Sequence, residues 1–164
     1  MSKRASGLVL IHAAPSHMLR QIGWSISRTL RYEVVVDWAA QPVLAATHCS
    51  QISWQGTEDL GAALTSMLAG WKQIHFEVIA EDDAGKPMSR WLYTPSLGIR
   101  HMNLDQAGNY LIGEDQLRVA LATAKPYELV RTIENLLAQP WEEALEPFRA
   151  GTHEASSYLL TRAG

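Results

Sequence analysis

The stretch QIHFEVIAEDDAGKPMSRWLY, residues 73–93, decides the fold. Apolar side chains at Ile74, Phe76 and Val78 occupy every second position, and this period of two is typical of a β-strand with one buried face. The sequence DDAG at residues 82–85 predicts a turn, and a second strand follows it. We therefore predict an antiparallel β-hairpin over this stretch.

Upstream of the hairpin, the hydrophobic pattern changes between the periods of a strand and a helix. A continuous apolar run at residues 8–11 predicts a strand, and it leads into residues 16–30, where apolar side chains recur every three or four positions. Residues 32–38 and 50–55 alternate as strands do, and residues 58–70 carry a second helical stripe. With the hairpin's first strand, the order is strand, helix, strand, strand, helix, strand.

This order predicts the fold class. It is the split βαβ pattern of ferredoxin-like folds, in which both helices cover one face of an antiparallel sheet. Residues 99–112 then indicate a weaker hairpin, and residues 117–124 and 129–137 carry helical apolar stripes. We predict an α+β fold with a ferredoxin-like βαββαβ core, followed by extra hairpin strands and C-terminal helices.

A short last helix is predicted to begin at Pro140. Trp141, Leu145 and Phe148 share one side of it. Because isolated helices of this length are marginal in water, we expect this apolar side to dock onto the rest of the domain. The solvent side is expected to carry Glu142, Glu143 and Glu146.

Length and composition fit a single domain. The chain has 164 residues, of which 47% are hydrophobic, and this suffices for a sizeable core. We predict one α+β domain over residues 1–150. Residues 151–164 are mostly small and polar, so we predict a loosely ordered tail there.

Charge and hydropathy disfavour nucleic-acid and membrane partners. The formal net charge is −3, and the arginines are dispersed rather than gathered in a basic stripe. No apolar run has the length of a membrane span or of a signal-peptide core. We therefore predict a soluble cytoplasmic protein without a membrane partner.

Cysteine and histidine positions indicate neither a disulfide nor a metal site. Cys49 is the only cysteine, and the six histidines lack the close spacing of zinc ligands. We predict no metal and no cofactor. No catalytic residue is indicated either, so the sequence leaves enzyme activity undecided.

Several segments together resemble a known family. They are SWQG at 53–56, YTPSLGI at 93–99, EDQLR at 114–118, PW at 140–141 and LEPFR at 145–149. The chain resembles an actinobacterial family of proteins of unknown function, domain of unknown function 3145, from about Gly7 to Arg149. The resemblance implies an actinobacterial cytoplasmic protein. It brings no activity, cofactor or catalytic residue with it.

Two places are candidate binding sites. His12 and His17 flank the predicted turn from the first strand into the first helix, and we expect them to converge there. The second face of the sheet, opposite the two helices, is expected to combine polar and aromatic side chains. This face is predicted to carry His75, Glu77, Trp91 and Tyr93.

These residues leave two functional interpretations open. We favour a non-catalytic interaction or regulatory module that binds a protein partner, because no catalytic constellation is present. The alternative is a small-molecule-binding protein or enzyme with a cleft near His75, Glu77 and Tyr93. Exposed aromatic side chains on a sheet also stack nucleic-acid bases, but carboxylates on the same face would repel phosphates. The sequence leaves the oligomeric state open.

Overall fold

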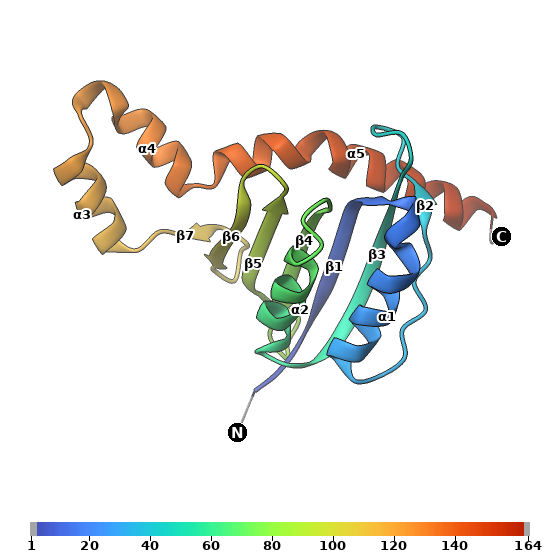
Figure 1. Cartoon of the computed structure of the whole chain (residues 1–164). Helices are drawn as coiled ribbons and strands as arrows, with labels where there is room; N and C mark the ends of the chain where they lie inside the picture. The colour runs from blue at the N-terminus through green and yellow to red at the C-terminus, as the bar shows by residue number, and fades with distance from the viewer. Residues whose placement is uncertain (1–2, 163–164) are drawn as a thin grey trace.

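The computed structural model describes the backbone of residues 3–162 and the side chains of residues 3–152. Within this part of the chain, a seven-stranded antiparallel sheet and five α-helices form a mixed α+β architecture (Figure 1). The strand order across the sheet is β2-β3-β1-β4-β5-β6-β7. The strands are β1 Arg4–Pro15, β2 Ala39–Ala40, β3 Thr47–Thr57, β4 His75–Glu81, β5 Pro87–Thr94, β6 Gly98–Leu104 and β7 Tyr110–Leu111. The helices are α1 Leu19–Leu30, α2 Leu60–Ala69, α3 Glu114–Thr123, α4 Leu129–Leu136 and α5 Gln139–Arg162.

The long strand β1 lies in the interior of the sheet. It pairs antiparallel with β3 on one side and with β4 on the other. The predicted hairpin is confirmed as β4 and β5, with Phe76 opposite Tyr93. The weaker hairpin is confirmed as β6 and β7, and β6 also pairs with β5.

α1 and α2 cover one face of the sheet and form the main core with it (Figure 1). Ile22 of α1 and Leu64 of α2 are completely buried there. Gly61 allows α2 to approach the sheet closely, because a Cβ at this position would lie 2.7 Å from the ring of Trp91. The prediction that both helices lie on one face is confirmed.

α5 crosses the opposite face of the sheet. Leu145 is completely buried beside Leu92 and Met102. Trp141 is half-buried against the same residues and donates its Nε1–H to the carbonyl oxygen of Gly98 at 3.0 Å. The predicted docking of this helix onto the domain is confirmed, although the helix is longer than the sequence pattern indicates.

Residues 32–38 do not form the predicted strand. Their backbone polar groups bond to side chains: the Val34 N–H donates to Ser27 Oγ at 3.0 Å, and the Asp37 carbonyl accepts from Ser50 Oγ at 2.7 Å. The predicted alternation is present in the burial, because every second side chain packs against the core. The alternation therefore predicts correctly which side chains are buried, but it does not predict strand pairing. The packed side chains are Val34, Val36 and Trp38.

The side chains of β5 point to the opposite faces of the sheet from those that we predicted. The β4–β5 register shifts between Ala80 and Glu81, which leaves Met88 as an extra, bulged residue in β5. A shift of one residue moves every following side chain to the other face of the sheet. Trp91 and Tyr93 consequently lie in the helix-covered core and not on the second face.

The last helix continues beyond the predicted domain boundary. α5 reaches Arg162, whereas the sequence predicts a loosely ordered tail from residue 151. Residues 163–164 of that tail lie outside the described residues. The division into a domain and a tail stays a prediction. None of the helices in the described chain is long and apolar enough to cross a membrane.

α3 and α4 form a two-helix extension, residues 114–136, which we call the arm. A short 3-10 turn at Pro126–Glu128 joins the two helices. The arm projects past the β7 end of the sheet and covers neither sheet face (Figure 1). All residues of the arm are described, and Ala120 is the only one that is buried.

Candidate functional site

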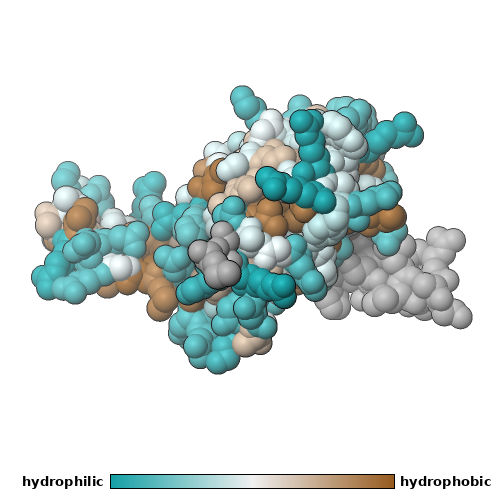
Figure 2. All heavy atoms as spheres, turned by 90° about the horizontal axis from the view of Figure 1, so that it is seen from below, coloured by the Kyte–Doolittle hydropathy of each residue, from teal (hydrophilic) through white to brown (hydrophobic). Residues whose placement is uncertain are grey.

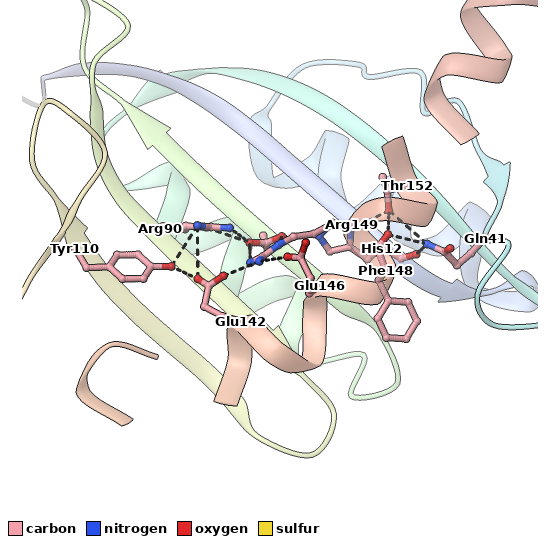
Figure 3. Close-up of polar contacts among 10 residues, drawn as sticks. His12, Gln41, Arg90, Tyr110, Glu142, Glu146, Phe148, Arg149 and Thr152 are labelled. Atoms are coloured by element: carbon pink, nitrogen blue, oxygen red, sulfur yellow. Dashed lines mark hydrogen bonds and ion pairs between the residues drawn. The ribbon is translucent and has the colours of Figure 1, made fainter. Parts of the chain in front are cut away.

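Glu77 is a charged residue in the interior of the sheet. Its neighbours Phe76 and Val78 point into the helix-covered core, so Glu77 points to the opposite face, beneath α5. The side chain is 0% exposed. A buried carboxylate requires hydrogen-bond donors to replace its lost hydration, and three side chains supply them (Figure 3).

The three donor side chains come from three different elements. His12 of β1 donates from Nε2 to Glu77 Oε2 at 2.6 Å. Arg149 of α5 binds both carboxylate oxygens, from Nε at 2.9 Å and from Nη2 at 2.7 Å. Arg90 of β5 donates to Oε1 from Nε at 3.0 Å and also from Nη2. We call these four residues the Glu77 cluster.

The cluster keeps Glu77 ionised. Burial by itself would raise the pKa of Glu77, but the hydrogen bonds from His12 and Arg149 and the charge of Arg90 hold it well below its usual range. The carboxylate accepts five hydrogen bonds, and a carboxylate offers about four lone-pair sites. Glu77 therefore has no acceptor capacity left for a substrate and no proton to give.

A second carboxylate, Glu142, links the two arginines on the outer side of the cluster. It accepts from Arg149 Nη1 at 2.6 Å and from the hydroxyl of Tyr110, which itself accepts from Arg90 Nη1 at 3.2 Å. Burial and the neighbouring Glu142 raise the pKa of Tyr110 above its ordinary value, so the phenol stays protonated. Our prediction of a solvent-facing Glu142 was wrong, because positions 142 and 149 share the α5 face that turns toward β5.

His12 is held on its other side by α5. Its Nδ1 lies 2.8 Å from Thr152 Oγ1, and that hydroxyl donates to the carbonyl of Phe148 at 2.8 Å. Both ring nitrogens of His12 are therefore engaged, Nε2 by Glu77 and Nδ1 by Thr152. The arrangement of Thr152, His12 and Glu77 leaves neither ring nitrogen unbonded.

Gln41 completes this contact between α5 and the sheet. Its Nε2 donates to the carbonyl of His12 at 2.7 Å and to the carbonyl of Phe148 at 3.3 Å. Gly151 permits the approach, because a Cβ there would lie 2.1 Å from Gln41 Oε1. The cluster thus fixes the position of α5 on β1 and β4.

A small recess lies beside the cluster. Its volume is about 240 Å³, and Leu10, Gln51, Arg90 and Arg149 are among its lining residues. The buried carboxylate of Glu77 and the apolar side chain of Leu10 both line it. This recess could admit a small molecule, but the acceptor atoms of Glu77 are already occupied.

The comparison with family models assigns the chain. The model of a family described as "Protein of unknown function (DUF3145)" matches residues 8–162, a range that includes the whole Glu77 cluster and the arm. The chain belongs to the DUF3145 family. No curated protein and no solved structure matches it. DUF3145 membership thus confirms the resemblance and adds no activity to it.

The structure of this DUF3145 chain brings some of the predicted site residues together. His12 and Glu77 are in direct contact, and His75 lies nearby, stacked on the ring of Phe148 with 4.5 Å between ring centroids. Burial lowers the pKa of His75, and the neighbouring His12 adds to this effect, so its imidazole is neutral. These residues share the surface on which α5 rests.

The other predicted site residues lie elsewhere. His17 is exposed in the short 3-10 helix Ser16–Met18, while the ring nitrogens of His12 contact Glu77 and Thr152. Trp91 stacks on His101, with 4.7 Å between ring centroids. Tyr93 stacks on Phe76 in the core at 5.0 Å.

Sequence reasoning missed the residues that neutralise Glu77. Arg90 lies on the same sheet face as Glu77 because of the bulge in β5, and no local sequence pattern predicts this bulge. Arg149 had a readable signal, because it follows Glu142 by seven positions and therefore lies on the same side of the last helix. An acid flanked by apolar residues in β4 was a second signal, since a buried carboxylate requires a cation. Across the described side chains, no group of His, Cys, Asp and Glu is arranged to hold a metal ion.

The depressed pKa of Glu77 predicts a pH dependence of stability. An unfolded glutamate has a pKa of about 4.3, so Glu77 contributes its full stabilisation above that pH and loses it as the pH falls toward the lower folded value. We expect the Glu77 side-chain carboxyl signal in ¹³C NMR not to titrate near pH ~4.3. A normal titration step there would contradict this account of the cluster.

Proposed function

We propose that the protein is a non-catalytic interaction module that contacts a protein partner through its arm. The observation that carries this proposal is the exposure of large apolar side chains on the arm. Leu121, Tyr127 and Val130 are 69%, 76% and 70% exposed. Single exposed apolar residues are ordinary on protein surfaces, but several on one small projection are typical of an interaction site.

The Glu77 cluster supports this proposal because its polar groups are already bonded to one another. Its carboxylate is saturated with donors, and both ring nitrogens of His12 are engaged by Glu77 and Thr152. The cluster fixes α5 on the sheet, and α4 contacts α5. We infer that its role is to hold the base of the arm in place.

The experiment is affinity purification of the tagged full-length chain from the native cell. We compare the wild type with the double variant Leu121→Glu, Val130→Glu and with the control Val35→Glu, whose side chain is 81% exposed away from the arm. Glutamate keeps good helix propensity, so the arm variant retains its helices. We expect one protein to be retained by the wild type and the control and lost from the arm variant. Equal retention by all three would contradict the proposal.

A second candidate function is small-molecule binding in the recess beside the Glu77 cluster. It is favoured by the pairing of an apolar wall, Leu10, with the guanidinium groups of Arg90 and Arg149, which are partly exposed. This chemistry suits a small carboxylate with an apolar tail. Saturable NMR shifts at Leu10 and Gln51 on adding octanoate would support it, and unchanged spectra would oppose it.

We also propose that the core is ferredoxin-like and that the protein is actinobacterial and cytoplasmic. The strand order β2-β3-β1-β4 with α1 and α2 on one face supports the ferredoxin-like assignment, with β2 in place of the longer strand expected at residues 32–38. The single unpaired cysteine suits a reducing compartment. Cell fractionation tests the location.

A further inference from the structure

β7 covers only the last part of the outer edge of β6. Asn103 lies opposite Leu111, and Leu104 lies opposite Tyr110. The chain then leaves the sheet at Gly113, which precedes α3 (Figure 1). Within the part of the chain that the structure describes, the start of β6 therefore has no strand beside it on this edge.

The hairpin geometry determines which main-chain groups of β6 point to this open edge. The Asp105 N–H donates to the Asn109 carbonyl oxygen at 2.9 Å, so position 105 points to β7. The direction of the N–H and carbonyl groups alternates along a strand, so His101 and Ile99 point the same way, beyond the end of β7. No described residue forms a hydrogen bond with these outward N–H and carbonyl groups.

A recess lies along this open edge, between β6 and the arm, and we call it the edge slot. Its volume is about 250 Å³, and the arm supplies one wall with Gln116 of α3 and Leu136 of α4. Figure 2 shows hydrophobic residues between the arm, at the left of the view, and the body of the molecule. The other lining residues are Arg100, His101, Met102, Asn103, Leu111 and Ile112.

We propose that the edge slot binds an extended peptide segment of a protein partner, which adds a strand to β6 in line with β7. This rests on the proposed function, because the arm is one wall of the slot. Outward-pointing residues of a strand lie about 6.8 Å apart, and a second strand presents its own donors and acceptors at the same spacing. The open main-chain groups of β6 therefore match a peptide backbone.

The charge of the edge slot favours a peptide with an acidic side chain. Arg100 is the only arginine or lysine among the lining residues, and none of them carries a carboxylate. Its Nη2 donates to the Leu136 carbonyl at 2.9 Å, which fixes the guanidinium, and no described residue bonds to its Nη1. A carboxylate on the added strand can pair with this guanidinium.

The two faces of the edge specify an alternation of side chains in the peptide. Ile99 lies opposite Tyr93 and faces the side of α2, whereas Arg100 lies opposite Leu92 and faces the side of α5. Ile99 is 47% exposed, so an apolar residue on the added strand can cover it. A fitting segment therefore places an acidic residue between two apolar ones.

The probe is the blocked peptide acetyl-TVEVT-amide, titrated into the full-length chain and followed by ¹H–¹⁵N NMR. We expect saturable shifts centred on the amides of Ile99 and His101. The same peptide with N-methyl groups on one valine and the adjacent glutamate should bind about tenfold more weakly, because adjacent residues direct their N–H groups to opposite edges and either alignment loses a bond. Acetyl-TVQVT-amide should also bind more weakly than the glutamate peptide.

The variant Ile99→Pro tests the edge from the side of the protein. Proline removes the outward N–H of position 99 and no bond to β5, and edge strands accept proline at such positions. We expect it to weaken binding of acetyl-TVEVT-amide about tenfold. The matched control Ile99→Val keeps the N–H and an apolar side chain, so it should bind like the wild type.

The N-methylated peptide tests the proposal on the unchanged protein, whatever the effect of proline on folding. Absence of saturable shifts up to the solubility limit of acetyl-TVEVT-amide, or equal binding of its N-methylated form, overturns strand addition. Equal binding of the glutamine peptide overturns the acidic preference. If no peptide binds but Leu121→Glu, Val130→Glu still loses its captured partner, the proposed function stands and only strand addition fails. If that capture is also unaffected, both fail.

Discussion

Replacing Glu77 by glutamine is expected to lower the free energy of unfolding by about 3–5 kcal/mol, the range for removing one member of a buried ion pair. Glu77 is completely buried, and its carboxylate is bound by Arg90, Arg149 and His12. Glutamine keeps the shape but removes the charge, so the cations beneath α5 lose their partner. Urea unfolding at neutral pH, with a linear extrapolation to water, measures the loss.

The matched control for Glu77 is Glu143→Gln. Glu143 is exposed on α5 and accepts a hydrogen bond from Gln139 Nε2 at 3.0 Å. Exposed substitutions of this kind change stability by less than about 0.5 kcal/mol. If Glu77→Gln cost no more than the control, the Glu77 cluster would not be what holds α5 on the sheet.

Replacing Trp141 by alanine is expected to lower the free energy of unfolding by about 3 kcal/mol, the lower end of the range for truncating a large aromatic residue in a core. The lower end applies because Trp141 is half-buried. The ring packs beside Leu92 and Met102, and the guanidinium of Arg100 lies 5.7 Å from its centroid. Thermal and urea unfolding both report the change.

Two further variants separate the contributions of Trp141. Trp141→Phe keeps a ring but loses the hydrogen bond to the Gly98 carbonyl, so we expect a loss of about 1 kcal/mol beyond the change in packing. Trp24→Ala truncates an exposed tryptophan on α1 and should change stability little. A Trp141→Ala melting curve that matches the wild type would mean that α5 is not anchored through this residue.

Local patterns in the sequence predicted most elements of the fold. The apolar alternation in β4 and the helical stripes of α1 and α2 each report on which side chains are buried, and burial is what these periods measure. Residues 32–38 show the limit of this reasoning. Their side chains alternate as in a strand, but their backbone groups bond to Ser27 and Ser50, and side-chain burial alone does not determine backbone pairing.

The candidate site was less predictable because it depends on contacts between distant parts of the chain. The bulge at Met88 sets which face Trp91 and Arg90 occupy, and a one-residue register shift has no local hydrophobic signature. Glu77 was identified as a candidate from its place in β4. Its partner Arg149 lies 72 positions away on α5, and only the three-dimensional packing brings the two together.

Site-specific photo-crosslinking in the native cell tests most directly the proposal that the arm is the contact surface of the protein. A benzophenone side chain is placed at the position of Leu121, of Val130 or of the control Val35 in the full-length chain. All three positions are exposed, so the probe does not disturb the core. The account predicts a discrete crosslinked product from the two arm positions and none from Val35. No product from the arm, or an equal product from Val35, would contradict it.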